Sequence, residues 1–303
     1  MNTVRRATLL CVSIGFAACE RAKAPVPVDT SALRAAHAAD SAAIAASPTR
    51  NWDANAGPVL LVPAGAADQA FVIAPDSVQS ARQLSAIPRP AAVTLFARNG
   101  AVQSAELPAV ADTSVCAIEQ LTAAPPPRPW NIGFIGGVVA PVAMDSVQSF
   151  SPADSAMLAA GMTRLASALP NDPAGRFTGL PFVARAIWRF SIPQGSQVVV
   201  TSFVRQINQE ATPLQERTLL VAERPANDTT LTTAYWERSY GDEETIESRD
   251  VLAAVLIGAA RTPALIISHD FGDATAYGFI ERVDEGRWRS RWLSGRRQCA
   301  APG

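Results

Sequence analysis

Short runs in which apolar and polar residues alternate make up most of the second half of the chain. The runs occupy residues 182–192, 196–207, 216–224, 263–270, 276–283 and 286–293. Alternation with a period of two is typical of strands that bury one face. Turn residues separate the last three runs, at Gly272-Asp273 and at Asp284-Glu285-Gly286. We therefore predict two antiparallel meanders of three strands each.

A hairpin is predicted earlier in the chain. The segment from Val93 to Leu107 places Asn99-Gly100 between two strand-like runs. An Asn-Gly pair favours the positive φ angles of tight hairpin turns, which makes it the strongest short-range signal for this motif.

One helix is predicted between the hairpin and the first meander. Ser151 is suited to be its N-cap, Pro152 its first residue, and Asp154 the acidic member of a capping box. Pro170 favours its end. Apolar residues at helical spacing form one stripe: Leu158, Met162, Leu165 and Leu169.

A second helix is predicted after residue 241. Acidic residues crowd its start, and Gly258 favours its end. The expected acidic turn and apolar face are Asp242, Glu243, Glu244 and Glu247, then Val251, Leu252, Val255 and Leu256. The resulting fold class is α+β, with mainly antiparallel β meanders and two amphipathic helices.

The first nineteen residues have the organisation of an export signal. Arg5 and Arg6 give a basic start, and residues 7–18 form an apolar run too short to span a bilayer as a helix. The segment Phe16-Ala17-Ala18-Cys19 then resembles the lipobox of bacterial lipoprotein signals. The resemblance covers this segment alone and implies that Cys19 is acylated and becomes the mature N-terminus. The alternative is an ordinary signal peptide followed by an incidental cysteine.

The resemblance also implies a location, and the composition of the rest of the chain indicates a domain organisation. It places the protein in the bacterial cell envelope, lipid-anchored and facing the periplasm or the exterior, with the outer membrane preferred. Residues 1–18 are then the signal peptide. Residues 19–57, rich in alanine and proline, are expected to form a tether, with a helical stretch from Ser31 to Ala46. Residues 58–303 are expected to form a β-rich globular domain, with two lobes divided near residues 123–130.

Two cysteines remain in the expected globular domain. Cys116 and Cys299 in an exported protein suggest one disulfide, which would join the C-terminus to the middle of the chain. The competing interpretation is two isolated buried thiols. Neither a CxxC motif nor a Cys/His ligand spacing occurs, so no structural zinc site is expected.

The overall composition is that of a globular protein, with 48% hydrophobic and 17% charged residues. The formal net charge of −1 gives no reason to expect a nucleic-acid partner. No cofactor is predicted, and no catalytic residue is assigned. The GxSxG, GxxxxGK[ST] and HExxH motifs do not occur in the chain.

His269 is the only histidine in the expected globular domain. Its neighbour Asp270 would point to the opposite face of a strand, so the two side chains are not expected to pair. We interpret His269 as a structural, partly buried histidine.

Two charged groups are candidate sites. The acidic residues from Asp242 to Asp250 suit a divalent cation, but the alternation of ligands around a glycine that calcium loops use is missing, so no metal site is assigned. Alternation over residues 287–292 places Arg287, Arg289 and Arg291 on one face and Trp288 and Trp292 on the other. The arginine face is a candidate binding surface for an anionic glycan, a lipid head group or an acidic protein. The tryptophans are expected to face the core.

Two hypotheses for the function follow. The first is a non-catalytic envelope lipoprotein, anchored to the membrane through its N-terminal lipid, whose β-rich domain binds or scaffolds an envelope partner. The second is an exported hydrolase with a carboxylate-based or His269-based site between lobes. Missing catalytic motifs favour the first. The sequence specifies neither the ligand nor the oligomeric state.

Overall fold

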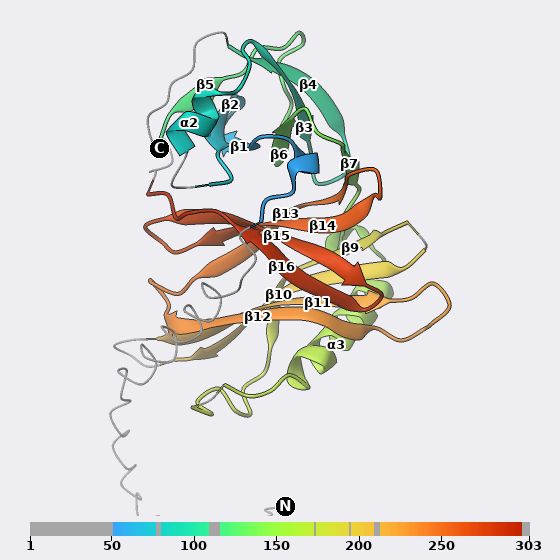
Figure 1. Ribbon diagram of the computed structural model, residues 1–303. Helices are drawn as coiled ribbons and strands as arrows, with labels where there is room; N and C mark the ends of the chain where they lie inside the picture. The colour runs from blue at the N-terminus through green and yellow to red at the C-terminus, as the bar shows by residue number, and fades with distance from the viewer. Residues whose placement is uncertain are drawn as a thin grey trace, which may run out of the picture.

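Three antiparallel β-sheets lie in successive layers, and one long helix covers the outer face of the last sheet (Figure 1). The computed structural model describes residues 51–76, 80–108, 116–172, 174–193, 195–208 and 213–298. We name the layers the upper, middle and lower sheets after their places in Figure 1. The predicted signal peptide, Cys19, the helical stretch of the tether and Cys299 lie outside the described residues.

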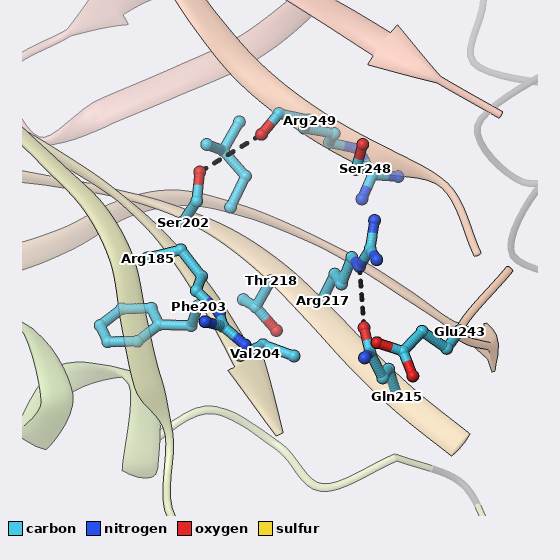
Figure 2. A pocket seen from close by; sticks show the side chains of 11 residues that line it. Arg185, Ser202, Phe203, Val204, Gln215, Arg217, Thr218, Glu243, Ser248 and Arg249 are labelled. Atoms are coloured by element: carbon cyan, nitrogen blue, oxygen red, sulfur yellow. Dashed lines mark hydrogen bonds between the residues drawn. The ribbon is translucent and has the colours of Figure 1, made fainter. Parts of the chain in front are cut away.

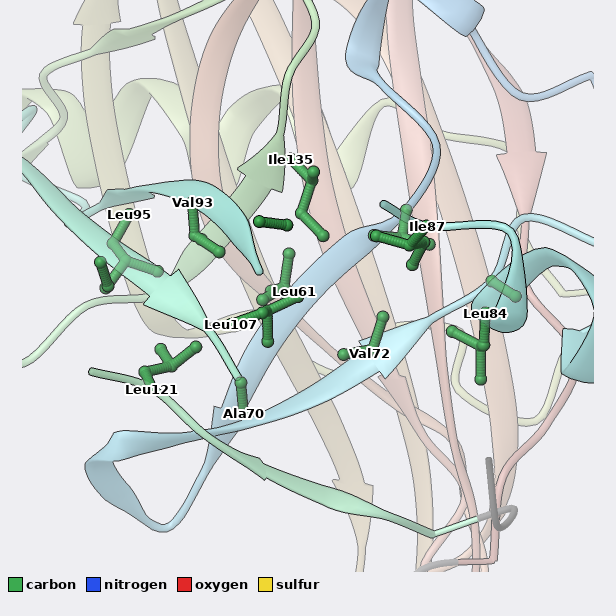
Figure 3. Packing of buried hydrophobic residues seen from close by; sticks show 14 of the residues in the cluster. Leu61, Ala70, Val72, Leu84, Ile87, Val93, Leu95, Leu107, Leu121 and Ile135 are labelled. Atoms are coloured by element: carbon green, nitrogen blue, oxygen red, sulfur yellow. The ribbon is translucent and has the colours of Figure 1, made fainter. Parts of the chain in front are cut away.

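The upper sheet has the strand order β4-β3-β6-β1-β2-β5. Backbone hydrogen bonds of 2.8 and 3.0 Å join Glu106 of β4 to Thr122, just after β5, and close the sheet into a small barrel. Apolar side chains such as Leu61, Val72 and Leu95 fill its interior (Figure 3). Its elements are β1 (Leu60–Ala64), β2 (Ala66–Ile73), α2 (Ser80–Ser85), β3 (Ala91–Phe96), β4 (Val102–Leu107), β5 (Ile118–Gln120) and β6 (Ile132–Ile135).

The predicted Asn99-Gly100 hairpin is confirmed. Strands β3 and β4 pair antiparallel on either side of residues 97–101. Gly100 has a φ of 83°, which residues with a side chain rarely adopt, and its N–H donates to Ala97 O at 2.9 Å.

The first predicted meander is confirmed within the lower sheet, whose order is β12-β11-β10-β9-β8. All neighbours in this sheet are antiparallel. Its strands are β8 (Asp145–Ser146), β9 (Val183–Ser191), β10 (Gln197–Ile207), β11 (Leu214–Arg224) and β12 (Thr232–Asp242).

The second predicted meander is confirmed within the middle sheet, whose order is β16-β15-β14-β13-β7. This sheet is also antiparallel throughout. Its strands are β7 (Val139–Val142), β13 (Ser248–Ile257), β14 (Thr262–Asp270), β15 (Thr275–Asp284) and β16 (Arg287–Leu293).

The helix predicted from Ser151 is confirmed as α3 (Pro152–Ser167). The Ser151 hydroxyl accepts a hydrogen bond from the N–H of Asp154 at 3.2 Å, which satisfies one of the unpaired amides of the first turn. Met162 is fully buried, and the rest of the predicted stripe packs with it against the outer face of the lower sheet. A short 3-10 turn, η2 (Val147–Ser149), precedes the helix.

The second predicted helix is wrong, because residues 248–257 form strand β13. The middle sheet is covered on both faces, so its strands need apolar side chains in both directions. Ala253 and Val255 pack toward the upper sheet, whereas Val251 and Ala254 pack toward the lower sheet. A continuous apolar run fits a doubly buried strand as well as a buried helix, and its sequence alone does not separate them.

The globular part starts before the predicted end of the tether. Residues 54–56 form a 3-10 turn, η1 (Ala54–Ala56), and Asn55 O accepts a hydrogen bond from Val138 N at 2.7 Å. Trp52 packs on Phe279 of the middle sheet. The upper sheet comprises residues 60–135, so the proline-rich segment 123–130 connects two strands within that sheet.

A buried ion pair fastens the middle sheet to the lower sheet near the β15–β16 turn. The fully buried carboxylate of Glu223 accepts hydrogen bonds from Arg282 at 2.6 Å and from the Trp288 indole at 3.0 Å. Burial alone raises the pKa of Glu223, but these hydrogen bonds outweigh it and hold the pKa below its ordinary value. The carboxylate is therefore stabilised in its charged form.

Candidate functional site

A pocket opens between the middle and lower sheets, at the end of their interface that lies away from Glu223. Its volume is about 270 Å³ (Figure 2). Strands β9, β10, β11 and β13 and the β12–β13 turn all contribute to it. The lining residues are Arg185, Ser202, Phe203, Val204, Gln215, Arg217, Thr218, Leu219, Glu243, Ser248 and Arg249.

The pocket forms where the inner face of the lower sheet changes from apolar to polar. Side chains two positions apart share a strand face. Along β11, that face carries the buried Val221 and Leu219 and then continues with Arg217 and Gln215. Ser202 lies opposite Leu219 on β10. The apolar packing of the two sheets therefore stops here, and polar groups line the opening.

Arg217 is the central cation of this pocket. Its side chain points from β11 toward β13, and its Nε donates to Oε1 of the buried Gln215 at 3.1 Å (Figure 2). Arg185 joins the lining from a bulge in β9. Among the described residues, no carboxylate is within ion-pairing distance of either guanidinium group.

The electrostatic environment of Arg217 reflects this position. Burial lowers the pKa of its guanidinium, and the nearby positive charge of Arg185 lowers it further. The carboxylates of Glu243 and Asp270 act in the opposite direction without restoring the ordinary pKa. Arg217 thus carries a partly desolvated positive charge that has no direct ion-pair partner among the described residues.

Arg249, by contrast, is neutralised behind the pocket. Its Nε lies 2.7 Å from a carboxylate oxygen of Glu237, and its Nη2 donates to Glu247 at 2.8 Å. The Tyr235 hydroxyl donates to Glu237 in turn. Burial and the Glu237 charge raise the pKa of Tyr235 well above its ordinary value, so the hydroxyl keeps its proton. Near the pocket, the carbonyl oxygen of Arg249 accepts a hydrogen bond from Ser202 Oγ at 3.3 Å.

His269 belongs to this same buried network, and it is more fully buried than the partly buried position predicted for it. Its Nδ1 lies 2.7 Å from Glu247 Oε1, and only 5% of the residue is exposed. Asp270 is exposed, as expected for the opposite strand face. On the other side of the ring, Nε2 lies so close to Gly278 that a Cβ there would come within 3.0 Å of it. His269 is therefore enclosed by the sheets and does not line the pocket.

The acidic residues from Asp242 to Asp250 do not gather at one point. Glu247 points inward to Arg249, Asp250 pairs with Arg98 at 2.9 Å, and Glu243 lines the pocket. The described residues contain no group of three or more potential metal ligands. These residues do not form the first turn of a helix as predicted, because they end strand β12, form the turn after it and begin strand β13.

The predicted arginine face is compensated by carboxylates. Arg287 pairs with Asp284, and Arg289 lies 3.7 Å from Glu281. Arg291 pairs with Glu281 at 2.5 Å and with Asp53 at 3.3 Å. These pairs leave less positive charge for a ligand here than at Arg217.

Both tryptophans of β16 face the core as predicted, but they do not share one face. Trp288 packs toward the lower sheet and Trp292 toward the upper sheet. A bulge shifts the β15–β16 register between the Ser290 and Trp292 pairs and reverses the alternation. Strict alternation over residues 287–292 is therefore wrong.

The pocket residues Arg185, Gln215 and Arg217 were missed by the sequence analysis. A signal for two of them existed, because Gln215 and Arg217 continue the face that Leu219 and Val221 define. Polar residues on the buried face at a strand end indicate that the covering layer stops there. Which strand would supply the opposite wall could not be read from the pattern.

The chain matches no protein-family model, no curated protein and no solved structure. Within the described residues, none of the helices has the length and apolarity needed to cross a membrane.

Proposed function

We propose that this protein is a non-catalytic lipoprotein of the bacterial cell envelope, anchored through an acylated Cys19, and that its β-sheet domain binds a ligand in the pocket beside Arg217. The observation that carries the binding role is the partly desolvated guanidinium of Arg217, which lines a cavity and has no ion-pair partner among the described residues. In the described part of the middle and lower sheets, the half-buried Arg217 lies within 4 Å of no glutamate carboxylate, whereas each buried arginine lies within that distance of one: Arg205, Arg238 and Arg249.

A hydrolase is supported less well by this geometry. Glu243 is the only carboxylate among the described lining residues, whereas acid–base hydrolysis of a glycoside uses two. The His269–Glu247 pair has the arrangement of a general base and its orienting carboxylate. Both side chains are more than nine-tenths buried and outside the pocket lining, so a substrate in the pocket would not contact them.

The first prediction concerns the membrane anchor. Replacing Cys19 with serine is expected to move the protein from the membrane fraction to the soluble fraction, because the thiol that carries the acyl chains is lost. The measurement is fractionation of cells that produce either chain, combined with the intact mass of the purified protein.

Cys116→Ser is the matched control, since it removes a cysteine that is not expected to carry lipid. It should remain in the membrane fraction. A Cys19→Ser protein that stays membrane-bound, with an intact mass that differs from the parent only by the substitution, would contradict the anchor.

The second prediction is a disulfide between Cys116 and Cys299. Sγ of Cys116 lies 3.6 Å from the carbonyl oxygen of Gln298, the residue before Cys299. Unfolded in denaturant without reductant, the protein is expected to react with no thiol-alkylating reagent, and after reduction it should gain two labels. Loss of the bond should reduce the free energy of unfolding by about 2–5 kcal/mol. Labelling of both cysteines without reductant would contradict the bond.

A further inference from the structure

We propose that the pocket beside Arg217 binds a ligand group carrying a single negative charge on oxygen, a carboxylate or a phosphodiester. This inference rests on the proposed binding function and specifies the chemistry of its ligand. Arg217 is the principal contact, and Arg185 and the hydroxyl groups of Ser202 and Ser248 surround the same cavity. Guanidinium and hydroxyl groups are the donors that such oxyanions prefer.

The charge of the ligand follows from the lining. Arg249 is neutralised by its two glutamates and adds nothing to the count. Arg185 and Arg217 contribute two positive charges, and Glu243 contributes one negative charge. The lining therefore carries one net positive charge, and the Asp270 carboxylate outside the lining reduces the field at Arg217 further. This balance suits a monoanion, whereas a dianion would be repelled by both carboxylates without a further cation.

The positive charge of Arg217 has an energetic cost in this pocket. Desolvation is the main cost and repulsion from Arg185 adds to it, whereas the attraction of Glu243 and Asp270 offsets only part. An oxyanion beside Arg217 would lower this cost. Gln215 holds Arg217 by its Nε, which leaves both terminal nitrogens to donate to an oxyanion. The site is therefore pre-organised before a ligand enters.

The size of the pocket limits the ligand. About 270 Å³ lies below the usual range of roughly 300–1,000 Å³ for pockets that enclose a drug-sized molecule. Apolar atoms of Leu219 and Val204 contribute to its wall. The pocket therefore accommodates a small carboxylic acid, or the charged end of a larger molecule such as a lipid.

The test is a calorimetric titration of the full lipidated protein in a non-ionic detergent. The probes are sodium acetate, sodium dimethyl phosphate and inorganic phosphate at a mildly alkaline pH, where inorganic phosphate is mainly the dianion, with sodium chloride added to equal ionic strength. Acetate or dimethyl phosphate is expected to bind more tightly than the phosphate dianion. Arg217→Gln should raise the Kd of the better probe by about 10- to 100-fold, as loss of a charge-assisted hydrogen bond does.

Two further variants complete the test: one removes the opposing charge of Glu243, and the other is a control away from the pocket. Glu243→Gln should lower the Kd for the monoanions severalfold and improve phosphate binding more, because it removes the opposing charge at an exposed position. Arg128→Gln changes an exposed arginine beside the upper sheet and should leave every Kd unchanged. Circular dichroism melts verify that each variant is folded.

A further arm distinguishes the two sources of the ligand group. The Cys19→Ser chain is mixed with vesicles of phosphatidylcholine alone or with added phosphatidylglycerol. If the chain sediments with the phosphatidylglycerol vesicles and Arg217→Gln abolishes this sedimentation, the result supports a lipid head group as the ligand. Absence of sedimentation, with the titrations as expected, supports a small soluble anion.

The inference is overturned if none of the probes binds, or if Arg217→Gln and Glu243→Gln leave the Kd values unchanged. Either result would be independent of the anchor, since membrane fractionation of Cys19→Ser reports on the anchor alone. If the pocket binds monoanions but the protein carries no lipid, this inference stands and the proposed location is wrong.

Discussion

Replacing Trp292 with alanine is expected to reduce the free energy of unfolding by about 3–5 kcal/mol, and to lower the melting temperature by about 10 °C. The side chain is fully buried between the upper and middle sheets. Its ring centroid lies 4.7 Å from that of Trp52 and 5.2 Å from that of Phe279, and its Nε1 donates to Pro75 O at 3.0 Å. Truncation removes these contacts together and leaves a cavity between two layers. The measurement is urea unfolding followed by circular dichroism.

Arg289→Ala is the matched control on the same strand. The Arg289 side chain is 56% exposed and lies 3.7 Å from Glu281, so its loss should change the free energy of unfolding by less than about 1 kcal/mol. Equal stability of the Trp292→Ala and parent proteins would mean that the upper sheet does not cover the middle sheet at this point.

The second large effect is expected from Arg249→Met. Methionine keeps most of the apolar stem of arginine and removes the charge. Glu237 and Glu247, both buried, would then lie near each other without their shared cation. Removing one member of a buried ion pair costs about 3–5 kcal/mol because the remaining charge stays buried. The free energy of unfolding, measured at neutral pH, should fall by that amount.

Arg287→Met provides the comparison with an exposed pair. Both the Arg287 and Asp284 side chains are more than 60% exposed, and such pairs contribute about 0–1 kcal/mol. A loss for Arg249→Met as small as that for Arg287→Met would contradict a buried network. It would indicate instead that water reaches Glu237 and Glu247 between the sheets.

Much of the secondary structure was predictable because its signals are local. The Asn99-Gly100 turn specifies its own geometry, and the cap at Ser151 satisfies amides within the same turn of helix. The alternating runs specify strands because each has one face that must be buried. None of these features depends on which distant segment covers the element.

Features that depend on the covering layers were predicted wrongly or missed. Residues 248–257 read as a helix because an all-apolar run has no polar face to reveal its period. They form a strand because the middle sheet is enclosed on both sides. Similarly, the bulge in β16 sends Trp288 and Trp292 to opposite layers, a result of fitting the strand to β15.

By itself, the sequence determined the Asn99-Gly100 hairpin, the six strands of the two meanders, helix α3 and the antiparallel class of the sheets, because short-range sterics and periodicity decide these. Only the tertiary structure decided which charges meet. Glu247 and His269 are 22 residues apart and share a hydrogen bond, and Glu223 and Arg282 are 59 apart and share another. The pocket beside Arg217 has the same origin, since its walls come from strands of two sheets. Stacking of the sheets brings together residues that are far apart in the sequence, and no local pattern encodes such contacts. At the pocket, this stacking leaves the guanidinium of Arg217 without a direct ion-pair partner among the described residues, and this defines the candidate site.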